Sequence, residues 1–287
     1  MARTPKSEVK TSNSRALVNW EEELAKQAEI AAGMEAKSGG GQFFSMQGGQ
    51  LKFNDSPMPG NQMAVVIIDH VFENIFYEGR YDPENPAPPT CFAFGRDDEM
   101  APHESVVAAG QAQNESCREC PHNQWGSSDV GRGKACRNIR RLALIPAGTF
   151  DAHNRFLPIE DEDHFETAGL AYMKLPVTSI NGFASFVKQV AGTLKRPPHG
   201  VFTRIRTESD PKTQFRVIFE PLAQVPNNLL PAIMKRHEEA KAVIEFPYNL
   251  EVEERQPPAR GRGRAAAQPA GRGGKQAPAQ QTRGRKY

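Results

Sequence analysis

Four cysteines constrain the fold of this chain more than any other feature, because they lie where the sequence offers little else to hold a structure together. All four fall in or beside residues 79–135, a stretch rich in Pro, Gly, Asp, Asn and Ser that shows no apolar periodicity. Ordering a backbone costs about 1–2 kcal/mol per residue, and a long loop without a core needs another source of order. We therefore expect the cysteines to supply that order.

The spacing of these cysteines is typical of a zinc site. A Cys-x2-Cys pair, Cys117 and Cys120, lies between two single thiols, Cys91 and Cys136. Such a pair binds an ion from one tight turn, and four thiolates complete the shell of a structural zinc. Structural zinc contributes roughly 10–16 kcal/mol in small peptide sites. We predict one structural Zn2+ per chain, bound by all four cysteines and ordering an insertion at residues 79–140.

Three other interpretations of the cysteines stay open: a redox pair like that of thioredoxin, a disulfide framework, or four unrelated thiols. A redox pair normally opens a helix after a strand, whereas this pair lies in SCRECPHNQWGS. Disulfides are rare in the cytoplasm. His103 and His122 are reserve ligands if Cys91 is too distant.

The sequence lacks the motifs of common enzyme classes. It has no GxxxxGK[ST], no GxSxG, no HExxH and no GxGxxG between a strand and a helix. A zinc ion with four thiolate ligands keeps no open position for a substrate, and the acidic run at 159–166 is predicted to be a solvated loop. We therefore predict a non-enzymatic protein with no small-molecule substrate.

Hydropathy indicates the compartment. Mean hydropathy is −0.60, and no apolar run approaches the ~18 residues that a membrane helix needs. The charged N-terminus is not followed by the apolar segment of a secretory signal. These features predict a cytoplasmic protein with no membrane partner.

Hydrophobic periodicity outlines a mainly β chain of the α+β class. Helical spacing marks residues 16–34, 179–194, with Ser179 as N-cap, and 227–244. Short apolar or alternating runs predict strands at 42–47, 50–54, 63–71, 141–148 and 169–177, and a β-hairpin at 200–220.

About six short strands and one internal helix predict an OB-like Greek-key barrel with flanking helices and a zinc-ordered loop insertion. A β-sandwich or another α+β sheet would give a similar pattern. We place an N-terminal arm and amphipathic helix at 1–41, the OB-like core with its insertion at 42–250, and a disordered tail at 251–287.

A basic segment follows the cysteine pair. Five cations occur there with no acid between them: Arg132, Lys134, Arg137, Arg140 and Arg141. Held in place by Cys136, they would contact phosphates, and Trp125 could stack on a base. The alternative is a charged surface beside an acidic patch of the same protein.

The hairpin offers a second candidate surface. If residues 207–211 form its loop, Arg204 pairs with Gln214 and Phe202 pairs with Arg216. One face then carries Phe202, Arg204, Arg206 and Arg216, as in barrels that hold single strands. Phe215, Val217 and Phe219 would join the core. A loop of four or six residues would give a different register.

Charge is distributed unevenly, although the net charge is only +2. Residues 255–287 hold nine Lys and Arg and no acid, so this segment carries +9 and the remainder −7. Its Arg, Gly, Ala, Pro and Gln cannot bury a core, which predicts disorder. The tail would bind a polyanion or fold back on the acidic body, and both interpretations stay open.

Three segments carry a family resemblance. NWEEELAKQA, PPTCFAFGRDDEMAPHE and CRECPHNQWGSSDVGRGKACRNIRRLALIPAG resemble a group of tailed-bacteriophage proteins of DNA metabolism that contain zinc and bind single-stranded DNA. The resemblance extends over about residues 16–245. It implies four-thiolate zinc at Cys91, Cys117, Cys120 and Cys136, but it does not by itself establish DNA binding.

The sequence thus predicts a single-stranded-DNA-binding protein of phage replication or recombination. Its partners would be single-stranded DNA, or RNA, and other replication or recombination proteins of the phage. The alternative is a zinc-containing transcription or RNA-binding factor that contacts host RNA polymerase. A structural protein of the virion would need repeats or heptads, and the sequence has neither.

Overall fold

The computed structural model describes residues 42–54, 56–79, 87–129 and 131–250, together with Leu24 and Gln27. Leu24 and Gln27 are helical, as predicted at 16–34, but the rest of that helix and the basic tail at 251–287 lie outside the described residues. The chain divides after Leu250, and the part before that residue is described below. None of the helices in the described ranges is long and apolar enough to cross a membrane.

The core is one mixed sheet with the strand order β10-β9-β4-β6-β8-β1-β2-β3, to which β5 adds on β4 and β7 adds on β6. Strands β1 and β8 run parallel, and the other described pairs are antiparallel. The strands are β1 (Gln42–Gln47), β2 (Gln50–Phe53), β3 (Ser56–Pro57), β4 (Gln62–Phe76), β5 (Cys91–Gly95), β6 (Arg137–Phe150), β7 (Phe156–Pro158), β8 (Ala171–Leu175), β9 (Val201–Asp210) and β10 (Gln214–Gln224). This sheet and its helices confirm the predicted mainly β, α+β class.

Helices connect and cover the strands. They are α2 (Glu104–Ala108), α3 (Glu162–Thr167), α4 (Ile180–Gln189) and α5 (Leu230–Val243), with short 3-10 turns η1 (Pro59–Asn61), η2 (Pro121–Asn123), η3 (Val177–Ser179) and η5 (Pro198–Gly200), and a π-helical turn η4 (Val190–Leu194) after α4. The helices predicted at 179–194 and 227–244 are therefore confirmed.

Two local predictions near these helices need detail. Ser179 is the N-cap residue of α4, as predicted, but its side chain forms no capping hydrogen bond. Its buried hydroxyl instead accepts a hydrogen bond from the Val217 N–H at 3.0 Å, which joins this turn to β10. The acidic run at 159–166 is not only a solvated loop. It contains α3, because Asp161 caps the first turn and Phe165 is fully buried.

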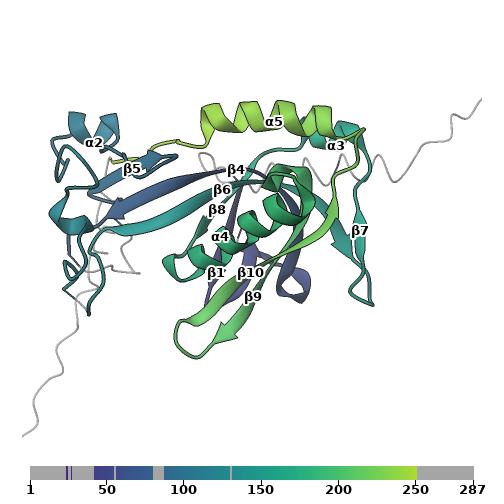
Figure 1. The fold of residues 1–287 in the computed structure, drawn as a ribbon, viewed down its shortest axis with the longest axis horizontal. Coiled ribbons are helices and arrows are strands. Elements are labelled where there is room, and N and C mark those ends of the chain that lie inside the picture. The colour runs from purple at the N-terminus through teal and green to yellow at the C-terminus, as the bar shows by residue number, and fades with distance from the viewer. Residues whose placement is uncertain are drawn as a thin grey trace, which may run out of the picture. The chain divides into compact units, whose positions relative to one another are not determined.

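Apolar residues of β4 alternate between two buried clusters, which explains why this strand is almost wholly apolar. Val65 belongs to the cluster that contains Phe183 of α4, called the α4 cluster below. Val66 belongs to the other cluster, called the α3–α5 cluster, together with Phe165 of α3 and Ile233 of α5. Figure 1 shows α3 and α5 along one side of the sheet and α4 on another, so both faces of the sheet are covered.

The two ends of the sheet approach each other around the α4 cluster. The Thr207 hydroxyl of β9 donates a hydrogen bond to the Gly49 carbonyl in the β1–β2 turn, and Asn61 Nδ2 donates to the same carbonyl at 3.0 Å. Gly49 has a φ of 78°, and a Cβ there would lie 3.2 Å from the Phe215 Cβ of β10. Only glycine suits this position without strain.

The β9–β10 hairpin has a different register from the predicted one. Asp210 pairs with Gln214, which leaves residues 211–213 as the turn, and Arg216 pairs with Glu208 rather than with Phe202. The Asp210 side chain accepts hydrogen bonds from the Lys212 and Thr213 N–H groups and fixes the turn. The core prediction holds: Val217 and Phe219 are buried in the α4 cluster, and Phe215 packs against it.

The ends of β4 and β6 extend beyond the core into a region that we call the cysteine lobe (residues 72–79 and 87–140). It contains β5, α2 and η2 and lies at the left of Figure 1. Contrary to the sequence-based expectation, the lobe has small apolar clusters of its own, one around Phe92 and Val106 and one around Met100. Tyr248 and Leu250, which follow α5, pack on the first cluster.

Candidate metal centre and nucleic-acid interface

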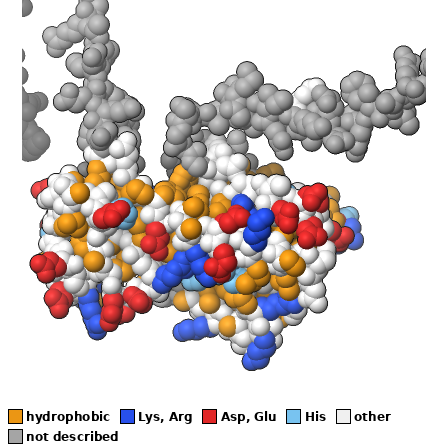
Figure 2. All heavy atoms as spheres, turned by 90° about the horizontal axis from the view of Figure 1, so that it is seen from above, with side chains coloured by type: hydrophobic (Ala, Val, Ile, Leu, Met, Phe, Trp, Pro, Cys, Tyr) orange, Lys and Arg blue, Asp and Glu red, His pale blue; other side chains and the backbone are white. Residues whose placement is uncertain are grey.

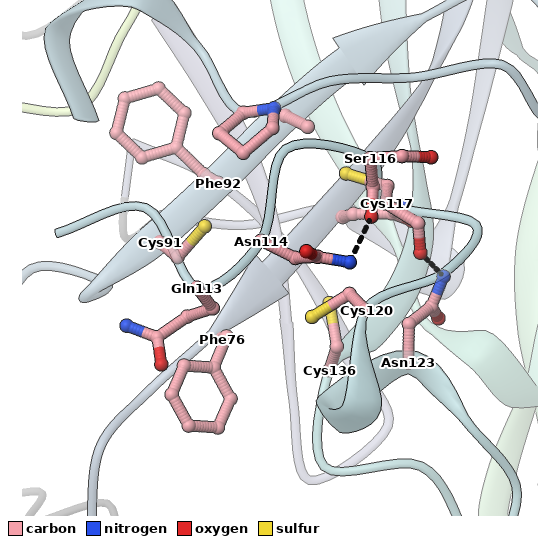
Figure 3. A pocket seen from close by; sticks show the side chains of 13 residues that line it. Phe76, Cys91, Phe92, Gln113, Asn114, Ser116, Cys117, Cys120, Asn123 and Cys136 are labelled. Carbon is pink, nitrogen blue, oxygen red and sulfur yellow. Dashed lines mark hydrogen bonds between the residues drawn. The ribbon is translucent and has the colours of Figure 1, made fainter. Parts of the chain in front are cut away.

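The fold brings the four cysteines to one pocket. Cys91 begins β5 opposite Phe76 of β4, and Cys136 immediately precedes β6 on the other side of β4. Cys117 and Cys120 come from the loop after α2, and all four line the same small pocket of about 20 Å³ (Figure 3). Each is at most 9% exposed, and none forms a disulfide.

Polar groups around the pocket are placed to stabilise sulfur ligands. The Gln113 backbone lowers the pKa of the Cys91 thiol, the Ile75 backbone that of Cys136 and the Asn74 side chain that of Cys117, each against the larger effect of burial. Asn123 Nδ2 donates to the Cys117 carbonyl at 2.7 Å and holds the turn. Donors of this kind around the ligands orient them and adjust their basicity in structural metal sites.

Burial disfavours free thiolates here. It raises the pKa of the Cys91 and Cys117 thiols, and for Cys136 burial and then the other three cysteines raise the pKa to about 12. None of the described residues that line the pocket is Lys or Arg. Four thiolates would therefore need a bound cation to share the site.

The donor set fits zinc, because four soft sulfur atoms with nearby N–H donors are the usual shell of a structural site. Within the described residues, however, no three side chains of His, Cys, Asp or Glu are already grouped as metal ligands are. Binding would require the four thiols to close on the ion. Zinc therefore stays a prediction, as do the redox and unrelated-thiol alternatives.

Comparison of the chain with protein-family models, curated proteins and solved structures gives no match. The predicted phage relationship and DNA-binding role thus depend on the residues of this chain. What the structure adds is the surroundings of each candidate residue.

Next to the thiols, the cysteine lobe presents an exposed aromatic side chain among cations. Trp125 is 80% exposed, and Lys134 Nζ lies 5.9 Å from the centroid of its ring. Arg132 and Arg137 are exposed on the same segment. Within the described part of the chain, none of these three cations forms an ion pair. This group, Trp125 with Arg132, Lys134 and Arg137, is called the basic ridge below.

Most acidic residues of the lobe lie in a different segment. Residues 97–119 hold six acids and one arginine, whereas 131–141 hold five cations and no acid. On the face drawn in Figure 2, acidic side chains lie at the left-hand end, where the lobe lies, and also over the centre and towards the right-hand end. The segment of the basic ridge, residues 125–137, therefore contains three cations and a single acid, Asp129.

Arg140 and Arg141 behave differently from the ridge. Arg140 is half-buried, and its guanidinium carbon lies 3.5 Å from the centroid of the Phe72 ring. Arg141 is 1% exposed and binds both carboxylate oxygens of the fully buried Glu73, at 3.0 and 2.9 Å. This burial corrects the expectation that Arg141 contacts nucleic acid, because no ligand can reach it.

Arg141 instead holds the segment after α5 against the sheet. It donates to the Ile244 and Phe246 carbonyls at 3.0 and 2.7 Å, and Tyr248 donates to Glu73. Sequence reasoning did not find this network. Its signal in the sequence was Glu73, an acid inside an otherwise largely apolar strand, which requires a buried partner.

The hairpin surface is corrected in two respects. Phe202 is 2% exposed and packs in the α3–α5 cluster with Phe165, so it cannot stack on a base. The hairpin arginines are compensated by acids of the same hairpin: Arg204 and Arg206 pair with Glu220, and Arg206 and Arg216 pair with Glu208. Of the two predicted surfaces, only the basic ridge has cations without an ion pair among the described residues beside an exposed ring.

Proposed function

We propose that this protein binds single-stranded DNA in phage replication or recombination, without enzymatic activity, through its zinc-containing cysteine lobe. The observation that carries the proposal is the basic ridge, in which an indole that is 80% exposed lies among cations with no ion-pair partner in the described residues. Single-strand-binding proteins combine aromatic side chains that stack on bases with cations that follow the phosphates.

The position of the lobe in the fold supports this interpretation. Strands β4, β6 and β8 are consecutive neighbours, α4 follows, and β9 returns to pair with β4. A fourth strand that returns beside the first is a Greek-key arrangement. Together with the hairpin partner β10, this strand order supports the proposal of an OB-like barrel of five strands. OB barrels bind oligonucleotides with the loop between their first and second strands. In this chain that loop, between β4 and β6, is the cysteine lobe.

A zinc ion would be held by Cys91, Cys117, Cys120 and Cys136, and it would supply structural cross-linking with no open coordination position. The role of this chain's own residues is to fix the loop before β6. The Cys136 N–H donates to the His122 carbonyl at 2.8 Å, and the Asn123 side chain holds the Cys117 carbonyl. Because these bonds lie at the base of the basic ridge, they keep Trp125 and its cations on a preformed surface, which lowers the entropy lost on binding.

The test is a fluorescence-anisotropy titration of the full chain with labelled oligo-dT, duplex DNA and single-stranded RNA over a series of salt concentrations. The proposal predicts tightest binding to single-stranded DNA and a loss of about 1–3 kcal/mol for that ligand in Trp125→Ala. Arg216→Ala, which removes an exposed arginine of the hairpin, serves as the matched control. Equal binding of duplex and single strand, or tightest binding of RNA, would favour the transcription or RNA-binding alternative.

A further inference from the structure

We propose that a cavity beside the basic ridge holds one unpaired nucleotide and prefers a base with an exocyclic amino group, cytosine above thymine. This inference rests on the proposed function, because it specifies which nucleotide the single-strand interface takes.

The cavity has a volume of about 540 Å³ and lies between the end of β4 and the loop that precedes β6. Its lining includes Tyr77, His122, Lys134 and Arg137. Ligand pockets in proteins usually measure about 300–1,000 Å³. The space therefore admits a base with its sugar and phosphate.

Rings and cations occur together around this cavity. The Arg137 guanidinium lies 5.9 Å from the centroid of the Tyr77 ring, and His122, whose ring stacks on Phe76, lines the same space. Lys134 lines the cavity and also lies over Trp125, so it connects the cavity with the exposed ring. A strand that stacks on Trp125 can place the next nucleotide here, because its phosphate meets Lys134 or Arg137.

Hydrogen bonds that do not use these cations hold the walls of the cavity. The Ser127 hydroxyl donates to the His122 carbonyl at 2.9 Å and accepts from the Ala135 N–H at 3.0 Å. On the other wall, the Glu78 N–H donates to the Thr90 hydroxyl at 3.0 Å. Lys134 Nζ donates one hydrogen bond, to Asn123 Oδ1 at 3.2 Å, and neither Lys134 nor Arg137 forms an ion pair with a described residue. Both can therefore contact a phosphate, and the walls are formed in the absence of a ligand.

Two carboxylates distinguish this cavity from a site that binds only phosphate. Glu78 and Asp129 both line the cavity and are exposed, and neither forms an ion pair with a described residue. A carboxylate repels phosphate, but it accepts hydrogen bonds from the amino group of a base, as Glu and Asp do with cytosine N4. Thymine has no amino group. Cations for the phosphate and carboxylates for the base edge together describe one amino-bearing nucleotide.

The experiment compares the affinities of the full chain for labelled 12-mers of dC and dT by competition anisotropy. We expect the wild-type protein to bind oligo-dC about fivefold or more tightly than oligo-dT, the lower limit for one well-placed base contact. In Glu78→Ala combined with Asp129→Ala, the ratio should fall toward one. Glu115→Ala, which removes another exposed acid of the cysteine lobe, should keep the wild-type ratio.

Thermal unfolding and zinc content, equal in all variants, establish that each protein is folded. Equal affinity of the wild type for the two oligomers would overturn this inference while leaving single-strand binding in place. A cytosine preference that persists in the double variant would also overturn it, because the carboxylates would not be its source. Absence of binding to either oligomer would remove the proposed function and this inference together.

Discussion

The cysteine lobe and the β9–β10 hairpin are both rich in arginine, but the structure compensates their charges differently. In the hairpin, the register places Glu220 opposite Arg204 and Glu208 opposite Arg216, so each of these arginines has an acid across the strands. In the lobe, residues 131–141 contain no acid, and the basic ridge keeps its cations without ion pairs in the described residues. Cation density in a sequence therefore indicates a polyanion-binding surface only where the fold leaves the cations without ion pairs.

The largest effect is expected from removal of a metal ligand, which would disrupt the lobe and leave the hairpin unchanged. Purified protein should contain one zinc per chain by plasma mass spectrometry, and Cys120→Ser should lose it. Residues 79–140 should then become sensitive to limited proteolysis, whereas the sheet core should stay protected because its two apolar clusters do not include the cysteines. A zinc-free wild-type protein with a protease-resistant lobe would contradict the metal assignment.

A second prediction compares a buried arginine with a compensated surface arginine. Arg141→Met leaves the carboxylate of Glu73 buried without its partner, so the free energy of unfolding in urea should fall by about 3–5 kcal/mol. Arg216→Met should change it by about 0–1 kcal/mol, because the pair of Arg216 with Glu208 is exposed. Similar losses in the two variants would show that Arg141 does not hold the segment after α5.

A third prediction compares Trp125 with Phe202, the two aromatic residues that the sequence analysis placed in the nucleic-acid interface. Trp125→Ala should weaken single-strand binding by about 1–3 kcal/mol without lowering stability, because the indole is exposed. Phe202→Leu should lower stability because the ring is buried, yet leave the affinity of the folded protein unchanged. Anisotropy at raised salt, where nonspecific binding by the tail weakens, and urea denaturation provide the two readouts. If Phe202→Leu weakened single-strand binding and Trp125→Ala did not, the DNA interface would lie on the hairpin instead.

The smallest effect concerns the salt dependence of binding. Arg137→Ala should flatten the log–log slope of affinity against salt by about 0.7 for single strands, as expected for one lost phosphate contact. Arg216→Ala should flatten it less, because this arginine already pairs with Glu208. Equal changes in slope would mean that the ion pairs of the hairpin open for DNA and that the two regions are equivalent.

Periodicity was sufficient to predict the elements of the core. Alternation of apolar residues predicted β9 and β10, and helical spacing predicted α4 and α5. It was also sufficient to predict that Val217 and Phe219 are buried. These features depend on local pattern, which one chain segment contains in full.

Register and burial could not be predicted in the same way, because they depend on partners distant in sequence. The turn at 211–213 is fixed by the Asp210 side chain, and this places Arg216 opposite Glu208. Phe202 is buried because α3 covers its face of the sheet. The site of the four cysteines could be predicted in part. Their spacing predicted that they share one site. The structure adds the reason that Cys91 and Cys136 reach this site, which is that β5 and β6 both pair with β4.

The central claim, that single-stranded DNA binds the cysteine lobe rather than the hairpin, is tested most directly by photo-cross-linking. The full chain would be irradiated with a single-stranded oligonucleotide that carries a photoreactive base analogue, and the modified peptides identified by mass spectrometry. Cross-links to Trp125 and to the peptides that contain residues 122–137 are predicted, with none in 201–220. Cross-links confined to 201–220, or none in the lobe at saturating DNA, would contradict the account.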